Sequence, residues 1–358
     1  MIANTTTELS EDDEAEFMVS TLMQFTNPLI ANFLQAHSIT KSGNKETLEA
    51  KVKQGIKSGK IPLPNIVKFV NEASLWRRQH VYLFDGPSQV TQTYRNEKRF
   101  RNHLEKRGLD HLLDNPLPVV LPDEMKLVSI GHSNNRIRIS AVVRTIDRQR
   151  DKSLDEFEES KISKTSDSLG AVIYVEKKAF KVRIARTVVS FEWSTVTNSP
   201  SFAILQISEM PSGNSYPEIC KAFLELIQDI IPMSDFSEFD LSKIVANIHD
   251  AEENNTSPET RSHRYDYLAP SGGKLSGSSS GTTAGVCNDP GIAPLIRAGR
   301  NLGGGGVFAN VYFLADDQYL LSDLHVYVYV NDAKIRIARH CVEEEVRHVV
   351  SRLRHFAV

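Results

Sequence analysis

Hydrophobic residues in the middle and C-terminal parts of the chain alternate with polar ones, or run together, in short stretches rich in Val, Ile and Phe. Such stretches are typical of β-strands with one or both faces buried. They lie at 127–130, 136–143, 170–175, 181–191, 202–208, 307–314, 319–330 and 334–340. We therefore expect a strand-rich domain over this part of the chain.

Hydrophobic positions with helical spacing of three and four residues occupy a separate N-terminal region. Four helices are predicted there, beginning near residues 28, 44, 64 and 89. Two further helices are predicted among the strands, at 217–231 and 343–353, each with an apolar stripe that faces a core. Helices first and strands afterwards indicate an α+β protein rather than an alternating α/β one.

The pattern divides the 358 residues into an acidic flexible leader at 1–24, a basic helical domain at 25–115 and an α+β domain at 116–358. Residues 250–306 are polar and turn-rich, and 11 of the 19 glycines of the chain lie from 268 onward within them. Such a composition buries too little apolar surface to offset the entropy of ordering. We expect a disordered loop at 250–306 that interrupts the α+β domain, because strand patterning resumes at Val307.

The composition argues against several classes of protein. No run approaches the ~18 consecutive apolar residues of a membrane span. The first twenty residues carry six acids and no base, the reverse of a targeting peptide. Cys220, Cys287 and Cys341 are too widely spaced for a disulfide framework or a zinc site. We expect an intracellular protein, cytoplasmic and DNA-associated or nuclear, with no membrane contact and no metal.

Positive charge is concentrated in one region. The net charge of the chain is −3, but residues 33–107 hold 15 Lys and Arg against 6 Asp and Glu, so the remainder carries −12. A basic region inside an acidic protein suggests a polyanionic partner for that region.

The strongest motif lies at 27–60, where Phe33 and Leu34 end one helix and Leu48 and Val52 lie in the next. Between the helices stand Ile39 and a Gly43-Asn44-Lys45 turn. This stretch resembles the SAP family, a helix-extension-helix DNA-binding module, although Ile39-Thr40 stands where that family often has Gly-Leu. The resemblance covers about 35 residues and implies binding of double-stranded DNA at the start of the second helix.

The resemblance places a phosphate against the backbone N–H groups of Gly43 and Asn44 and the ammonium group of Lys45. Cations around the motif and beyond it would extend the contact along the duplex backbone. The predicted DNA-binding residues are Gly43, Asn44, Lys45, Lys51, Lys53, Lys57, Lys60, Arg77, Arg78, Arg95, Arg99 and Arg101. An ordinary helical hairpin with a solvated lysine face is the alternative.

A second constellation is the stretch AVIYVEKK, in which Glu176 and Lys178 follow an apolar strand and Asp167 or Asp155 precedes it. It resembles the second half of the PD-(D/E)xK nuclease motif, in which carboxylates hold Mg²⁺. The same letters are typical of an exposed hairpin turn, which we favour.

No P-loop spacing, paired zinc ligands or serine nucleophile motif occurs in the sequence. We therefore expect a non-enzymatic protein without a cofactor, which contacts the duplex backbone with little sequence preference. The α+β domain would meet a protein partner or a second copy. The alternatives are a metal-dependent nuclease that uses Glu176 and Lys178, and a protein-interaction scaffold.

Overall fold

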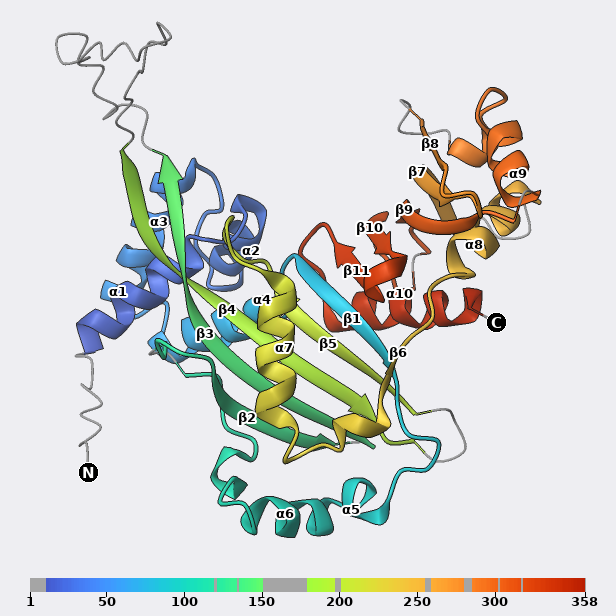
Figure 1. Ribbon diagram of the computed structural model, residues 1–358. Helices are drawn as coiled ribbons and strands as arrows, with labels where there is room; N and C mark the ends of the chain where they lie inside the picture. The colour runs from blue at the N-terminus through green and yellow to red at the C-terminus, as the bar shows by residue number, and fades with distance from the viewer. Residues whose placement is uncertain are drawn as a thin grey trace, which may run out of the picture.

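The computed structural model describes residues 11–118, 121–133, 135–150, 179–196, 201–254, 259–279, 285–301, 303–316 and 318–357. It has an N-terminal helical module followed by one large antiparallel sheet with helices on its faces (Figure 1). The expected α+β class is confirmed. The described residues contain no helix long and apolar enough to cross a lipid bilayer.

The helical module consists of α1 (Glu11–Leu22), α2 (Asn27–Ala36), α3 (Lys45–Lys57) and α4 (Leu63–Leu75). The apolar stripes of the four helices meet in one core, in which Phe33, Leu48, Val52 and Ile66 are buried. Helical spacing of these residues gives each helix one apolar side, so burial of that side stabilises the module.

Within the described residues the sheet has eleven strands, and their spatial order is β2-β3-β4-β5-β1-β11-β10-β9-β7-β8, with the short β6 beside β1. The strands are β1 (Gln79–Asp85), β2 (Lys126–Ser133), β3 (Arg136–Arg150), β4 (Phe180–Ser194), β5 (Phe202–Ser208), β6 (Ser237–Glu238), β7 (Thr260–Leu268), β8 (Lys274–Ser278), β9 (Gly305–Phe313), β10 (Leu324–Tyr329) and β11 (Lys334–Ile337).

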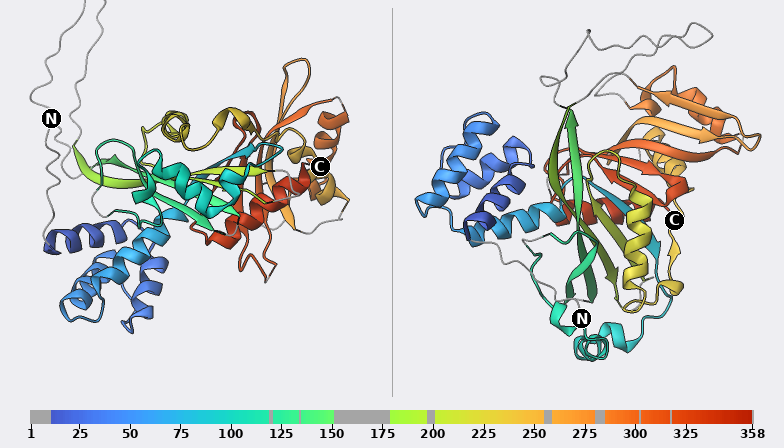
Figure 2. Two further views of the ribbon diagram at one scale, coloured as in Figure 1. Left: turned by 90° about the horizontal axis from the view of Figure 1, so that it is seen from below. Right: turned by 60° about the vertical axis from the view of Figure 1, so that its left-hand side comes forward.

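Helices cover the two faces of the sheet unequally. α7 (Tyr216–Ile227) and α6 (Glu97–Glu105), which α5 (Gln92–Arg95) precedes, pack over one face of β3, β4, β5 and β1. α8 (Ile244–Glu253), α9 (Ala293–Asn301) and α10 (Glu343–Phe356) belong to the core on the opposite face. Figure 2 shows α7 and α10 on opposite sides of the sheet.

Among the described residues, no helix packs on the outward side of β11, β10, β9 and β7 in the half of the sheet beyond α7 (Figures 1 and 2). The side chains on this side are half-buried at alternate positions of β10, whereas their neighbours along the strand are fully buried. The second half of the sheet therefore has one covered face and one open face.

The helical module is attached to the sheet by apolar and polar contacts. Leu75 of α4 packs with Leu117, Val142 and Val188 in a small separate core. The amide of Asn71 donates a hydrogen bond of 3.2 Å to the carbonyl oxygen of Leu117. The guanidinium of Arg138 on β3 lies 5.2 Å from the ring centroid of Trp76, which follows α4.

Two expectations from the sequence differ from the structure. Residues 79–85, expected within the helical domain at 25–115, form β1 in the middle of the sheet, paired with β5 and β11. The apolar run VYLF is short enough to suit a helical core or a strand, and only its distant partners decide between them. The sheet therefore begins before residue 115.

The disordered loop expected at 250–306 is the second difference. Its described parts include β7, β8 and α9, which are ordered elements of the second half of the sheet. Tyr265, Tyr267 and Ile296 anchor these elements because all three side chains are buried in the main core. A few large apolar side chains outweigh the glycine-rich composition around them.

We expect Tyr265→Ala to lower the free energy of unfolding by about 3 to 5 kcal/mol, because it empties a fully buried site. Chemical denaturation followed by circular dichroism measures the change. Leu268→Ala, at a 44% exposed position of the same strand, is the matched control and should change stability by less than about 0.5 kcal/mol. Equal stability of the two variants would contradict an ordered β7.

Candidate nucleic-acid interface

Helix α6 carries the densest unpaired positive charge among the described residues. The side chain of Asn96 caps it by accepting a hydrogen bond of 3.0 Å from the backbone N–H of Arg99. Phe100 and Leu104 on its inner side are fully buried against the sheet. The helix is therefore fixed in place by its apolar side, and its orientation sets where the opposite side points.

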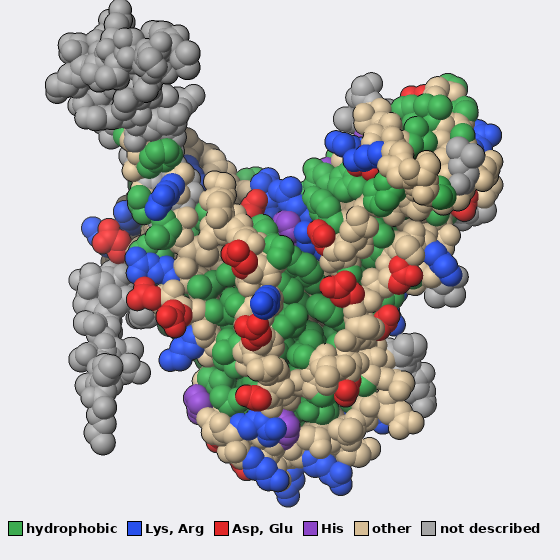
Figure 3. Space-filling model, viewed as in Figure 1, with side chains coloured by type: hydrophobic (Ala, Val, Ile, Leu, Met, Phe, Trp, Pro, Cys, Tyr) green, Lys and Arg blue, Asp and Glu red, His purple; other side chains and the backbone are tan. Residues whose placement is uncertain are grey.

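The outer side of α6 and the turn after it present Lys98, Arg99, Arg101 and Lys106, all of them exposed. None of the four forms an ion pair with an acid in the part of the chain that the structure describes. By contrast, exposed cations elsewhere, such as Arg144 and Arg297, pair with Asp123 and Glu253 respectively. Figure 3 shows Lys and Arg side chains gathered at the end of the molecule where Figure 1 places α5 and α6.

Two neighbouring residues hold α6 to the loop after α7. The imidazole of His103 lies 3.0 Å from the carbonyl oxygen of Ile230, and burial lowers the pKa of His103. The guanidinium of Arg107 donates to the carbonyl oxygen of Asp229. Arg95 on α5 is half-buried, and its Nε atom has no partner among the described residues. His103 and Arg107 therefore fix the position of the basic helix, and Arg107 remains exposed.

The turn before α3 has a backbone conformation that favours glycine. Gly43 has a φ of 137°, and a Cβ at this position would lie 2.7 Å from Cβ of Thr47. The side chain of Asn44 caps α3 by accepting a hydrogen bond of 2.9 Å from the N–H of Thr47. The arrangement of helix, extended segment and helix is thus present, within a module of four helices.

The first lysines of α3 have internal roles. The ammonium of Lys45 donates to the carbonyl oxygen of Phe25 at 3.3 Å. Lys51 donates to the carbonyl oxygens of Thr40 and Ser42 at 3.0 and 2.6 Å, which fixes the extended segment between α2 and α3.

Lys53 pairs with Glu49 at 2.7 Å, and the hydrogen bond to that carboxylate raises its pKa. Lys57 and Lys60, at the end of α3, are exposed and have no ion-pair partner among the described residues. Among the lysines of α3 and the turn after it, Lys57 and Lys60 are therefore the ones without a hydrogen-bond or ion-pair partner among the described residues.

Arg77 and Arg78 lie between the module and the sheet. Burial lowers the pKa of Arg77, whose guanidinium lies 5.8 Å from the ring centroid of Phe25. Arg78 lies 3.6 Å from the carboxylate of Glu209. The predicted residues thus form two groups, on α3 and on α5–α6, which lie on different parts of the molecule, with these two arginines at the junction (Figure 1).

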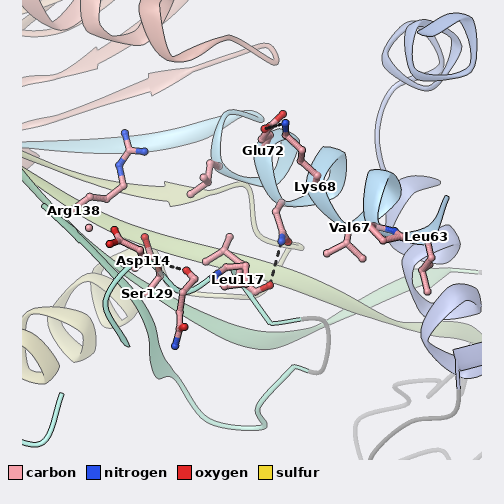
Figure 4. A pocket seen from close by; sticks show the side chains of 15 residues that line it. Leu63, Val67, Lys68, Glu72, Asp114, Leu117, Ser129 and Arg138 are labelled. Carbon is pink, nitrogen blue, oxygen red and sulfur yellow. Dashed lines mark hydrogen bonds and ion pairs between the residues drawn. The ribbon is translucent and has the colours of Figure 1, made fainter. Parts of the chain in front are cut away.

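A pocket of about 970 Å³ lies between α4 and strands β2 and β3 (Figure 4). Three of its charged side chains have protein partners, since Lys68 lies 4.0 Å from Glu72 and Arg138 pairs with Glu192 on β4. Leu63, Val67 and Leu117 supply apolar walls. The sequence pattern gives no signal for this pocket because its walls come from segments far apart in the chain.

The residues of the nuclease-like alternative, Asp155, Asp167, Glu176 and Lys178, lie outside the described residues. Within the described ranges, no group of three or more His, Cys, Asp or Glu side chains is placed to hold a metal ion. No family model matches the chain, and no curated protein sequence matches it either.

We expect Asn44→Ala to lower the stability of the protein by about 1 kcal/mol, because the N-terminus of α3 loses its cap. Urea unfolding measures the change. Lys57→Ala, at an exposed position of the same helix, serves as the control with an effect within about 0.5 kcal/mol. If both variants unfold at the wild-type urea concentration, the cap contributes nothing.

Proposed function

We propose that the protein binds double-stranded DNA through its phosphate backbone, with helix α6 as the main contact. The observation that carries this proposal is the row of exposed cations on α6 that lack acidic partners among the described residues. An exposed cation without a protein partner can neutralise a phosphate and release a condensed counterion, whereas a paired one must first give up its acid.

The proposal is also supported by the rigidity of α6. The helix is capped at Asn96 and anchored by Phe100 and Leu104, so its cations are presented at a fixed spacing. Contacts of this kind position a protein on the duplex without reading bases. We therefore infer weak sequence preference.

Lys57 and Lys60 form a second, smaller basic group at the end of α3. They support a second contact with the DNA backbone, made by the helical module. Both lysines lie within the stretch that resembles the SAP family. Because Lys45, Lys51 and Lys53 have protein partners, the start of α3 contributes mainly to the fold of the module. The sheet fixes the position of α6 directly and contacts the helical module through α4.

The variant Lys98→Ala/Arg99→Ala/Arg101→Ala should bind duplex DNA more weakly, with a nearly equal loss for different sequences. If each side chain neutralises one phosphate, the slope of log affinity against log salt should fall in magnitude by roughly 2 to 3. Fluorescence anisotropy with two unrelated duplexes at several salt concentrations measures both quantities.

The charge-matched control is Lys68→Ala/Lys221→Ala/Arg297→Ala, which removes three exposed cations that already have acidic partners. It should retain the wild-type salt slope within about 1. Thermal unfolding of both variants excludes a loss of fold. The proposal fails if the α6 variant is folded and binds duplex with unchanged affinity and slope.

A further inference from the structure

The open face of the sheet, defined as the outward side of β7, β9, β10 and β11, carries a continuous chain of aromatic rings. The ring centroids of Tyr312 and His325 are 4.5 Å apart with nearly parallel planes, and His325 and Tyr327 are also 4.5 Å apart. Phe308 follows at 6.3 Å from Tyr327 and 5.3 Å from Tyr329. Strand register explains this chain, since Tyr312 pairs with His325 and Phe308 pairs with Tyr329.

Cations from the strands on either side lie over these rings. Arg264 of β7 lies 5.6 Å from the centroid of Phe308, and Arg336 of β11 lies 5.5 Å from that of Tyr327. The ammonium of Lys334 lies 4.8 Å from the centroid of Tyr329. The guanidinium of Arg261, also on β7, lies 5.4 Å from the ring centroid of Tyr312. The rings thus occupy the two middle strands, β9 and β10, and the cations flank them from β7 and β11.

The charge of the open face is positive. Arg261 pairs with Asp323 at 2.9 Å and Lys334 pairs with Asp332 at 2.8 Å. Asp266 is shared between Arg264 and Lys274. Arg336 has no acidic partner among the described residues. Three acids therefore face four cations of these strands, of which Lys334 is buried, and Lys274 of the neighbouring β8.

The residues on the open face differ in type from the residues on the covered face of the same strands. The covered positions of β10 and β11 are Val326, Val328, Ile335 and Ile337, all fully buried. The open positions of β10 hold two tyrosines and an imidazole, and the positions of β9 paired with them hold Phe308, Asn310 and Tyr312. A surface meant only for water would carry short polar or charged residues at these positions.

We infer that this open face binds single-stranded nucleic acid, with bases stacked among the rings and phosphates near the arginines. Aromatic rings and guanidinium planes stack on unpaired bases of any sequence, and the positive charge of the face suits the phosphates between them. This inference concerns a surface separate from helix α6 and does not depend on duplex binding there.

A single strand fits the open face better than a duplex does. The four cations lie over ring faces, so they do not project from the sheet as the cations of α6 project from their helix. A duplex keeps its bases stacked on one another and offers mainly phosphates to a protein surface. Unpaired bases can instead reach the rings, which are half-buried but accessible.

A protein partner is the other occupant that an aromatic face with arginines could take. The chain of aromatic rings and the excess of cations over acids favour the nucleic acid. Figure 3 shows hydrophobic side chains with neighbouring Lys, Arg and His side chains on the upper right part of the molecule and in the recess beside it.

The test uses the full chain and labelled oligonucleotides of roughly 12 nucleotides, oligo-dT and oligo-rU, which have no pairing of their own. Both are titrated into the wild type and into the α6 triple variant, so that the charge of α6 is separated from the open face. Tyr327→Leu removes one ring and should weaken single-strand binding roughly 5- to 150-fold in both backgrounds. Its affinity for duplex DNA should stay at the wild-type value.

Tyr319→Leu is the matched control, because Tyr319 is exposed and stacks on His348 away from the open face. It should leave single-strand binding unchanged. Arg336→Gln, which removes the unpaired cation, provides an independent variant and should weaken binding and lower its salt dependence. Preference for oligo-dT or oligo-rU identifies the natural polymer. The inference is overturned if the α6 triple variant fails to bind either oligonucleotide, or if folded Tyr327→Leu and Arg336→Gln bind them as the wild type does.

Discussion

The pairing of β1 with β5 on one side and with β11 on the other is the constraint on which the rest of the structure depends. β1 follows the helical module directly, yet it lies in the middle of the sheet, between strands that come more than a hundred and more than two hundred residues later. Its side chains serve both cores, because Val81 and Leu83 face one side and Tyr82 and Phe84 the other. The module, the face that carries α7 and the face that carries α10 are therefore joined through one strand of seven residues.

Local patterns predicted the elements whose burial is encoded within a short window. The strand at 202–208 and the helices near 217 and 343 follow from runs and spacings of apolar residues that neighbouring sequence defines. β1 and the segment after residue 250 were predicted wrongly because their stability comes from distant partners. Tyr265, for example, is buried against a core built from α8 and β9, and its glycine-rich surroundings give no sign of that.

The roles of individual charged residues could not be predicted from the sequence either. The sequence identified the basic region, but only the structure separates cations that hold the protein together from cations that face solvent. Lys51 fixes two backbone carbonyls, while Lys98 and Arg101 have no such partner among the described residues. The open face was not predicted at all, because alternation distinguishes the two sides of a strand and does not indicate that rings from separate strands, such as Tyr312 and His325, lie together.

The position of β1 also determines the order in which the protein can assemble. During synthesis the helical module and β1 emerge before the other strands of the sheet, and the module has its own core, so it can fold early. β1 can pair with β5 once residues 202–208 are made, and the pairing of Val81 with Ile335 must wait until β11 is made. Contacts of such sequence separation are slow to form, so the second half of the sheet closes last and β1 remains an exposed strand edge until β11 arrives.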